Sequence, residues 1–297
     1  MKLKRKIEHA VGAKLVASKP LEVGFGLMGL HGTLDDGREI AVKSVANEGP
    51  VERQGQLDIE GTMLRELKAH SSLPVPDVYH LAPDFLIMSW IENDGGPITP
   101  AVEVHAAELL AELHGLKFPS FGYGCDTLIG PLHQPNPLTA SWIDFIRDQR
   151  LLYMARAAHG EGSLDAPLLD RLTRFCEKLP DLLTEPAHPS LIHGDLWTGN
   201  VLVKSGENGG ATSRRIAGFV DPAIYCAHPE IELAFTTMFG TFGTAFFDAY
   251  ETLSPLEPGF HDTRLEIYNL YPTLVHVRLF GSTYLSGIDR VLKRHGF

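Results

Sequence analysis

The sequence predicts an α+β fold with two lobes, a small β-rich N-terminal lobe over residues 1–92 and a larger, mostly helical C-terminal lobe over residues 93–297. Two observations predict this division. Short alternating apolar runs flank the turn residues Asp35-Asp36-Gly37, a pattern typical of a β-hairpin. Beyond the break at residues 93–97, NDGGP, apolar residues recur instead at helical spacing.

Composition limits the partners and the compartment. The 297 residues carry a formal net charge of −11, which argues against nucleic acid or an anionic membrane surface as the main partner. Cys125, Cys176 and Cys226 are isolated, which suits a reducing cytosol, and we expect all three to be buried. No stretch approaches the roughly 20 apolar residues of a membrane span, and the N-terminus lacks a signal-peptide pattern. We expect a cytoplasmic protein, and its oligomeric state stays open.

The N-terminal lobe begins with apolar residues at helical spacing, which predict a helix over residues 2–17. The hairpin follows, and its second strand, Glu39–Val45, carries Lys43. Gly24 and Gly26 precede the turn, where a glycine-rich loop lets backbone N–H groups approach a phosphate. Taken alone, such glycines are more often turn formers, and a lone strand lysine is more often solvated.

The run over residues 51–70 is predicted to form a helix with Leu57, Met63 and Leu67 on one side. Glu60 lies on this helix, and we expect it to pair with Lys43. Glu66 is the competing carboxylate on the same helix.

The apolar run over residues 85–91 predicts a buried strand that ends at Met88, Ser89 and Trp90. Such a strand would deliver a hinge whose backbone groups can hydrogen-bond a flat heterocycle. That interaction leaves no side-chain signature.

The second lobe is predicted to contain helices over residues 100–115, 142–157 and 164–183. A long ordered loop rich in Gly, Pro and Asn separates the first two. A hairpin with a turn at residues 208–210 follows later, and the remaining chain is aromatic and apolar at helical spacing, as expected of core helices.

The strongest functional motif lies in the stretch over residues 191–203, LIHGDLWTGNVLV. Its H-x-D-x-x-x-x-N pattern resembles the catalytic loop of protein-kinase-like phosphotransferases. In that plan Asp195 orients or accepts the proton of the attacking hydroxyl, and Asn200 holds Mg²⁺ against the phosphates of ATP. A second strand leads to Asp221, about twenty residues after Asn200, where the plan needs its other metal carboxylate. A strand-end aspartate is otherwise often only a turn former.

Further motifs are similar to those of the fructosamine kinase family: HGDLWTGN, DPAIYCAHPEIELAF and YNLYPTLVHVRLFG, with FGYGCDTLIG and QPN upstream. The resemblance implies a two-lobed protein-kinase-like fold and ATP-dependent phosphorylation of the sugar 3-hydroxyl of ketosamines. Fructosamine, ribulosamine or erythrulosamine adducts, on small amines or on glycated proteins, would be the substrates of this deglycation-type repair.

The resemblance also assigns roles to individual residues. Asp195 would be the proton acceptor, and Asn200 and Asp221 would hold Mg²⁺. The ATP site would be formed by Lys43, Glu60, Gly24, Gly26 and the hinge residues Met88, Ser89 and Trp90. Trp197 would stack on the sugar or its amine substituent, or else serve as a packing aromatic.

Three departures from the family pattern and two rival functions remain. The glycine loop lacks a cysteine found in many eukaryotic members, so redox control by a loop disulfide is not expected. Ser89 stands where a hinge glutamate is common, and Glu232 replaces an aspartate, which leaves the supporting role of that position open. The nearest rival is a kinase of the same fold acting on an aminoglycoside, choline or homoserine-like alcohol. A non-catalytic nucleotide-binding pseudokinase is disfavoured because the motif residues are intact.

Overall fold

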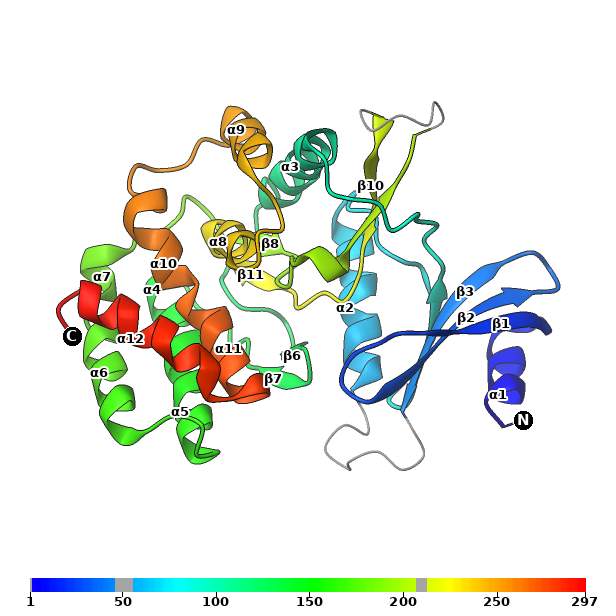
Figure 1. Cartoon of the computed structure of the whole chain (residues 1–297), viewed down its shortest axis with the longest axis horizontal. Coiled ribbons are helices and arrows are strands. Elements are labelled where there is room, and N and C mark those ends of the chain that lie inside the picture. The colour runs from blue at the N-terminus through cyan, green and yellow to red at the C-terminus, as the bar shows by residue number, and fades with distance from the viewer. Residues whose placement is uncertain (1, 46–55, 207–212) are drawn as a thin grey trace.

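The computed structural model describes residues 2–45, 56–206 and 213–297 and has the predicted two-lobed α+β architecture (Figure 1). The N-terminal lobe is an antiparallel sheet of five strands in the order β1-β2-β3-β5-β4. Its strands are β1 Leu15–Leu21, β2 Leu27–Leu34, β3 Glu39–Val45, β4 Val78–Ala82 and β5 Phe85–Ser89, and its helices are α1 Lys2–Val11 and α2 Leu57–His70. The predicted hairpin is therefore confirmed as β2–β3.

The alternation of side chains along β3 explains how this lobe presents its lysine. Ile40 and Val42 point into a small core shared with Ile7 of α1, whereas Ala41 belongs to the larger core that includes α2. Because side chains alternate along a strand, Lys43 lies on the same side as Ala41 and faces α2.

The predicted N-terminal helix is too long. It ends at Val11, because Gly12 takes the left-handed conformation at φ +68°, and Leu15 already starts β1. Glycine reaches that conformation without the penalty of a Cβ, so it ends helices readily. The first part of the helix predicted over 51–70 lies outside the described residues, and the described part is α2.

The C-terminal lobe is mostly helical, as predicted (Figure 1). Its longer helices are α3 Pro100–His114, α5 Leu152–Gly160, α6 Ala166–Cys176, α8 Glu230–Met238, α9 Thr244–Leu253, α11 Leu270–Phe280 and α12 Leu285–Arg294. Shorter helical segments are α4 Trp142–Phe145, η2 Ile146–Leu151, α7 Leu179–Leu182, η3 Thr198–Asn200, η5 Phe260–Arg264, α10 Leu265–Tyr268 and η6 Ser282–Tyr284. In the part of the chain that the structure describes, none of the helices combines the length and apolar character needed to span a bilayer.

Within the described residues, three two-stranded sheets complete this lobe and carry its loops. They pair β6 Thr127–Ile129 with β7 Leu132–Gln134, β8 Ser190–Ile192 with β11 Tyr225–Ala227, and β9 Val201–Lys204 with β10 Arg215–Phe219. The predicted second hairpin is β9–β10, and its predicted turn at 208–210 lies outside the described residues. Since β8 pairs with β11 and β9 with β10, the loop after β8 and the loop after β10 meet.

Candidate active site

The predicted pair between Lys43 and Glu60 is confirmed. Lys43 Nζ lies 2.8 Å from Glu60 Oε1 and 2.5 Å from Asp221 Oδ1, so one buried ammonium joins a carboxylate of the first lobe to one of the second. Burial lowers the pKa of Lys43, but Asp221 and Glu60 outweigh it, and the pKa rises above its usual range. The lysine therefore stays charged. The competitor Glu66 instead accepts a hydrogen bond from Tyr123 at 2.6 Å.

Asp195 lies in the loop between β8 and β9, where Asn200 fixes it. The Asn200 amide donates to the Asp195 backbone oxygen at 2.8 Å and to its Oδ2 at 3.1 Å. Burial, followed by the nearby Asp221, raises the pKa of Asp195 to about 7, while the Asn200 hydrogen bond opposes the shift. A carboxyl with this environment has gained basicity, which suits a proton acceptor.

Asp221 has an unusual backbone. Its φ is +54°, and among the described residues only Phe25 shares a positive φ without being a glycine. Aspartate tolerates this left-handed region better than most residues, and such outliers are enriched at functional sites. Both residues line one cavity together with Lys43 and Asp195, so the two outliers meet at the same place.

Asn200 and Asp221 have oxygens that fit a divalent cation. The Asn200 NH₂ group is occupied by donation, and among the described residues no hydrogen bond reaches its Oδ1. No cluster of three His, Cys, Asp or Glu side chains suited to a metal occurs in the described ranges. A Mg²⁺ site does not require such a cluster, because one or two protein ligands commonly suffice when phosphates and waters complete the octahedron.

The other residues predicted to bind the nucleotide differ in whether they line this cavity. Gly24 lines it, whereas Gly26 is not on its wall and forms the next bend at φ +72°. Met88 and Ser89 end β5 and Trp90 follows it, and none of the three is on the cavity wall. The Ser89 N–H donates to the backbone carbonyl oxygen of Asp77, and the Trp90 N–H donates to that of Glu39.

Trp197 separates two cavities. It is 44% exposed and lines both the cavity of about 180 Å³ that contains Lys43 and a larger one of about 540 Å³. Its six-membered ring lies over Gly199, where any Cβ would approach it to 2.3 Å. The indole is thus held at the boundary, and Asp195 lies there with it because it also lines both cavities.

The sequence left the supporting role of Glu232 open and did not point to its partners in the catalytic loop. Glu232 of α8 is buried, and its Oε1 accepts from the N–H of Gly194 at 2.5 Å. Its Oε2 lies 2.8 Å from Nε2 of His114 and accepts from the N–H of His193 at 3.3 Å. Burial raises the pKa of Glu232, but His114, His193 and the Gly194 N–H together outweigh it, so the pKa is lowered and the group stays a carboxylate. Its backbone partners leave no signal in a sequence.

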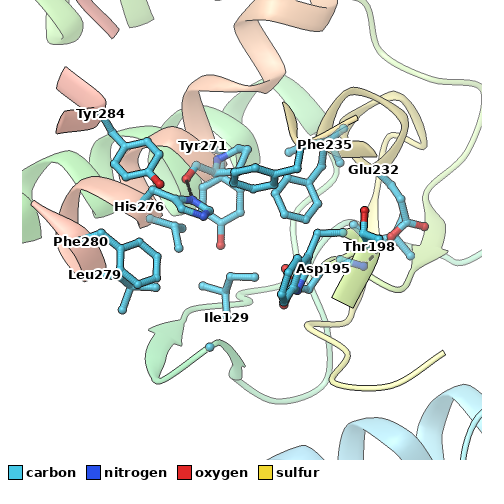
Figure 2. Close-up of a pocket in the computed structure, with 18 of the residues that line it drawn as sticks. Ile129, Asp195, Thr198, Glu232, Phe235, Tyr271, His276, Leu279, Phe280 and Tyr284 are labelled. Atoms are coloured by element: carbon cyan, nitrogen blue, oxygen red, sulfur yellow. Dashed lines mark hydrogen bonds between the residues drawn. The ribbon is translucent and has the colours of Figure 1, made fainter. Parts of the chain in front are cut away.

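The larger cavity is walled mainly by aromatic and aliphatic side chains of α8 and α11 (Figure 2). Phe25 reaches it from the N-terminal lobe, and the β6–β7 turn contributes Ile129 and Gly130. A volume of about 540 Å³ falls in the range of roughly 300–1,000 Å³ that is typical of small-molecule sites.

The chain is similar to known proteins over nearly its whole length. The family model of the fructosamine kinases matches residues 10–295. A protein of Enterococcus faecium named "Probable ketoamine kinase" is 34% identical over 249 residues, which are 82% of this chain and 84% of that protein. The chloroplastic protein-ribulosamine 3-kinase of rice, Oryza sativa subsp. japonica, is 31% identical over 265 residues, 86% of this chain and 72% of the relative.

A solved structure agrees with these sequence matches. The crystal structure of a Thermobifida fusca protein assigned as a fructosamine-3-kinase covers 98% of both chains with a TM-score of 0.85 and 29% identity. The predicted protein-kinase-like fold is confirmed, and the chain belongs to the fructosamine kinase family, whose members are ATP-dependent phosphotransferases with an alcohol group as acceptor.

Proposed function

We propose that this chain transfers the γ-phosphoryl group of ATP to the 3-hydroxyl of a ketosamine. Fructosamine, ribulosamine or erythrulosamine adducts, either small molecules or glycated proteins, are the substrate class. The observation that carries the proposal is the position of Asp195, which lies on the walls of both cavities. A hydroxyl in the larger cavity and a phosphate in the smaller one would meet at this carboxylate.

The smaller cavity is proposed as the phosphate end of the ATP site, with residues 1–92 as the nucleotide-binding lobe. Lys43, held by Glu60, would contact the phosphates, and backbone N–H groups near Gly24 and Gly26 would cover them. The adenine would lie toward the hinge at Met88, Ser89 and Trp90. The N–H groups of Ser89 and Trp90 already have backbone partners. The base would therefore contact the carbonyl groups of the hinge and the N–H groups after Trp90.

Asn200 and Asp221 are proposed as the protein ligands of Mg²⁺. A bound Mg²⁺ neutralises phosphate charge as it develops in the transition state. On the protein side, Lys43 contacts Asp221 through Oδ1, so the other carboxylate oxygen and the Asn200 Oδ1 would be the groups that meet the ion. Asn200 would meanwhile keep its amide on Asp195, so the same side chain positions both groups.

Asp195 is proposed to orient the acceptor hydroxyl and to take its proton as the oxygen–phosphorus bond forms. Phosphoryl transfer has a loose transition state, so positioning and charge neutralisation supply most of the catalysis. The Asn200 amide and the loop fixed by Glu232 hold the carboxylate in place. Residues 93–297 thus form the catalytic and substrate-binding lobe.

We also place the enzyme in the cytoplasm. Cys176 and Cys226 are buried free thiols, as predicted, whereas Cys125 is exposed, contrary to the prediction, because it lies in the loop before β6. Free thiols, one of them exposed, suit a reducing compartment.

The test is Mg·ATP turnover on ribulosamine, fructosamine, aminoglycoside and choline acceptors, with Asp195→Asn as the control. The wild type should phosphorylate only the ketosamines. The variant removes the proton acceptor while keeping its size, so kcat should fall about 10²–10⁴-fold, with ATP affinity nearly unchanged. Turnover confined to a non-ketosamine alcohol would refute the substrate class, and normal turnover by Asp195→Asn would refute the role of that carboxylate.

A further inference from the structure

The larger cavity has two chemically distinct ends (Figure 2). Asp195, Thr198 and Glu232 lie at one end, which we name the inner end. His276, Leu279, Phe280 and Tyr284 lie at the opposite end, named the outer end, and Phe239 packs against His276 there. A ligand that reaches Asp195 therefore has a long apolar wall beyond it.

The outer end is a cluster of rings in mutual contact. The His276 ring lies 5.1 Å from Phe239, 5.4 Å from Phe280 and 5.0 Å from Tyr284, measured between ring centroids. These separations suit tilted aromatic packing, and a further ring can join such a cluster in the same manner. Phe239 and Phe280 are 43% and 56% exposed, so apolar surface is available to a ligand.

The charges of the wall all have one sign. Asp195 and Glu232 are its carboxylates, and none of the described residues on the wall is a lysine or arginine. His276 adds no positive charge at neutral pH, since burial lowers its pKa. Its Nδ1 lies 2.7 Å from the Pro272 carbonyl oxygen, which can only accept, so Nδ1 holds the proton of the neutral ring. The wall suits a cation and opposes an anion.

We infer that the outer end binds the amine substituent of the ketosamine and selects adducts in which that substituent is aromatic and carries no negative charge. This inference rests on the proposed function, which places the 3-hydroxyl at Asp195. Only C1, C2 and C3 of the sugar then separate that hydroxyl from the amine, so the ammonium lies near the inner carboxylates and the aromatic faces. The group on the nitrogen extends toward Phe239, Phe280 and Tyr284. A carboxylate there finds no cationic partner.

The test compares N-methyl, N-benzyl and N-carboxymethyl adducts of one ketose by kcat/KM. Burial of the added ring should make the benzyl adduct about tenfold better than the methyl adduct or more, and the carboxymethyl adduct should be the poorest of the three. Phe280→Ala and Phe239→Ala should each reduce the benzyl-to-methyl ratio about three- to tenfold by removing a ring contact. Leu253→Ala, a comparably exposed apolar residue at the end of α9 that is not on the wall, should leave the ratio unchanged.

Two results separate this inference from the proposed function. Turnover of all adducts with the methyl adduct equal to or better than the benzyl adduct, or a ratio insensitive to both phenylalanine variants, overturns the inference alone. Absence of turnover on every adduct overturns the proposed function. Titration calorimetry of the benzyl and methyl adducts then decides the inference separately, because equal affinities overturn it and tighter benzyl binding supports it.

Discussion

A single buried carboxylate explains why the catalytic loop keeps its shape. Glu232 is 1% exposed and accepts hydrogen bonds from two successive N–H groups, those of His193 and Gly194. A buried N–H without a partner costs about 1–3 kcal/mol, so the two contacts tie the loop to α8. Tyr250 and His114 extend this hydrogen-bond network, because His114 contacts Glu232 and its Nδ1 lies 2.7 Å from the Tyr250 hydroxyl. Asp195 follows directly after the anchored residues.

We predict that Glu232→Gln lowers both stability and kcat. The amide has one accepting oxygen in place of two, so a backbone N–H or His114 loses its acceptor, at a cost of about 1–3 kcal/mol in the free energy of unfolding. Displacement of Asp195 should reduce kcat about tenfold or more, since catalysis depends on positioning. Urea unfolding and steady-state kinetics measure the two effects. Asp248→Asn, an exposed carboxylate on α9, is the control. Unchanged kcat in Glu232→Gln would exclude a positioning role.

The sequence predicted those residues whose chemistry requires one side-chain type at a fixed spacing. Asp195, Asn200 and Asp221 were found this way, and the structure brings all three together beside Lys43. Glu232 could only be marked as a position whose supporting role stayed open, because it holds the loop through backbone N–H groups that every residue except proline offers. Spacing therefore identifies candidate reacting groups better than the groups that hold them.

At the scale of elements, the site depends on how closely two loops approach. Gly194 has φ +86°, and a Cβ built there would lie 2.1 Å from the Ala223 carbonyl oxygen. The loop after β8 thus contacts the segment that follows Asp221, and Ala223 N–H donates to the His193 carbonyl at 2.7 Å. Only glycine satisfies both the backbone angle and the space.

We predict that Gly194→Ala loses more stability than the matched variant Gly240→Ala. Gly240 also has a left-handed φ, +64°, but no atom lies within 4 Å of its built Cβ. Both variants bear the conformational cost of about 1–2 kcal/mol, and only Gly194→Ala adds a clash with backbone. Denaturant unfolding should separate them by at least about 1 kcal/mol, with kcat falling only in Gly194→Ala. Equal losses would mean that the loops can move apart freely.

Element prediction from the sequence worked where the pattern was local. The β2–β3 hairpin was marked by its turn residues, whereas the strand β1 was hidden because Leu15 also fitted the preceding helical spacing. The π-helical turn η2 was also not predicted from the sequence. It buries Arg150 against the rings of Tyr225 and Tyr271, with Asn136 accepting from its guanidinium at 2.6 Å. Such a tertiary arrangement has no signature in spacing.

On the scale of the whole molecule, the two lobes share the larger hydrophobic core, which combines residues of α2 and β5 with those of the second lobe, and specific contacts also join them near the site. Lys43 of the first lobe bonds Asp221 of the second, and a Cβ on Gly130 would lie 3.1 Å from the ring of Phe25. Arg214 of the second lobe also bonds Asp94 at 2.9 Å, in the stretch that joins the lobes. The polar groups buried in the molecule include histidines and carboxylates, so its stability should depend on pH.

We predict that the protein loses stability as the pH falls from 7.5 to 5.5. Burial is the largest of the effects that lower the pKa values of four histidines, His105, His193, His228 and His276. The unfolded chain binds protons at these positions below about pH 6.5, where the native state does not, so acid favours unfolding. Asp195 and Glu60, whose pKa values are raised, act in the opposite sense, because the native state then takes up protons first. Four histidines against two carboxyls leave a net loss.

The part of this loss that comes from His228 can be measured by itself. Each net proton corresponds to about 1.4 kcal/mol per pH unit in the free energy of unfolding. The pKa of His228 is lowered to about 3, so its contribution should grow as the unfolded chain protonates around pH 6.5 and approach one proton at the acid end of the window. Its Nδ1 accepts from the Glu230 N–H at 3.2 Å, and an asparagine oxygen can replace that acceptor. His228→Asn should therefore flatten the pH slope by about one proton, as measured by urea unfolding at several pH values. A wild-type slope of zero, or a variant slope equal to that of the wild type, would contradict the role of buried neutral histidines in acid sensitivity.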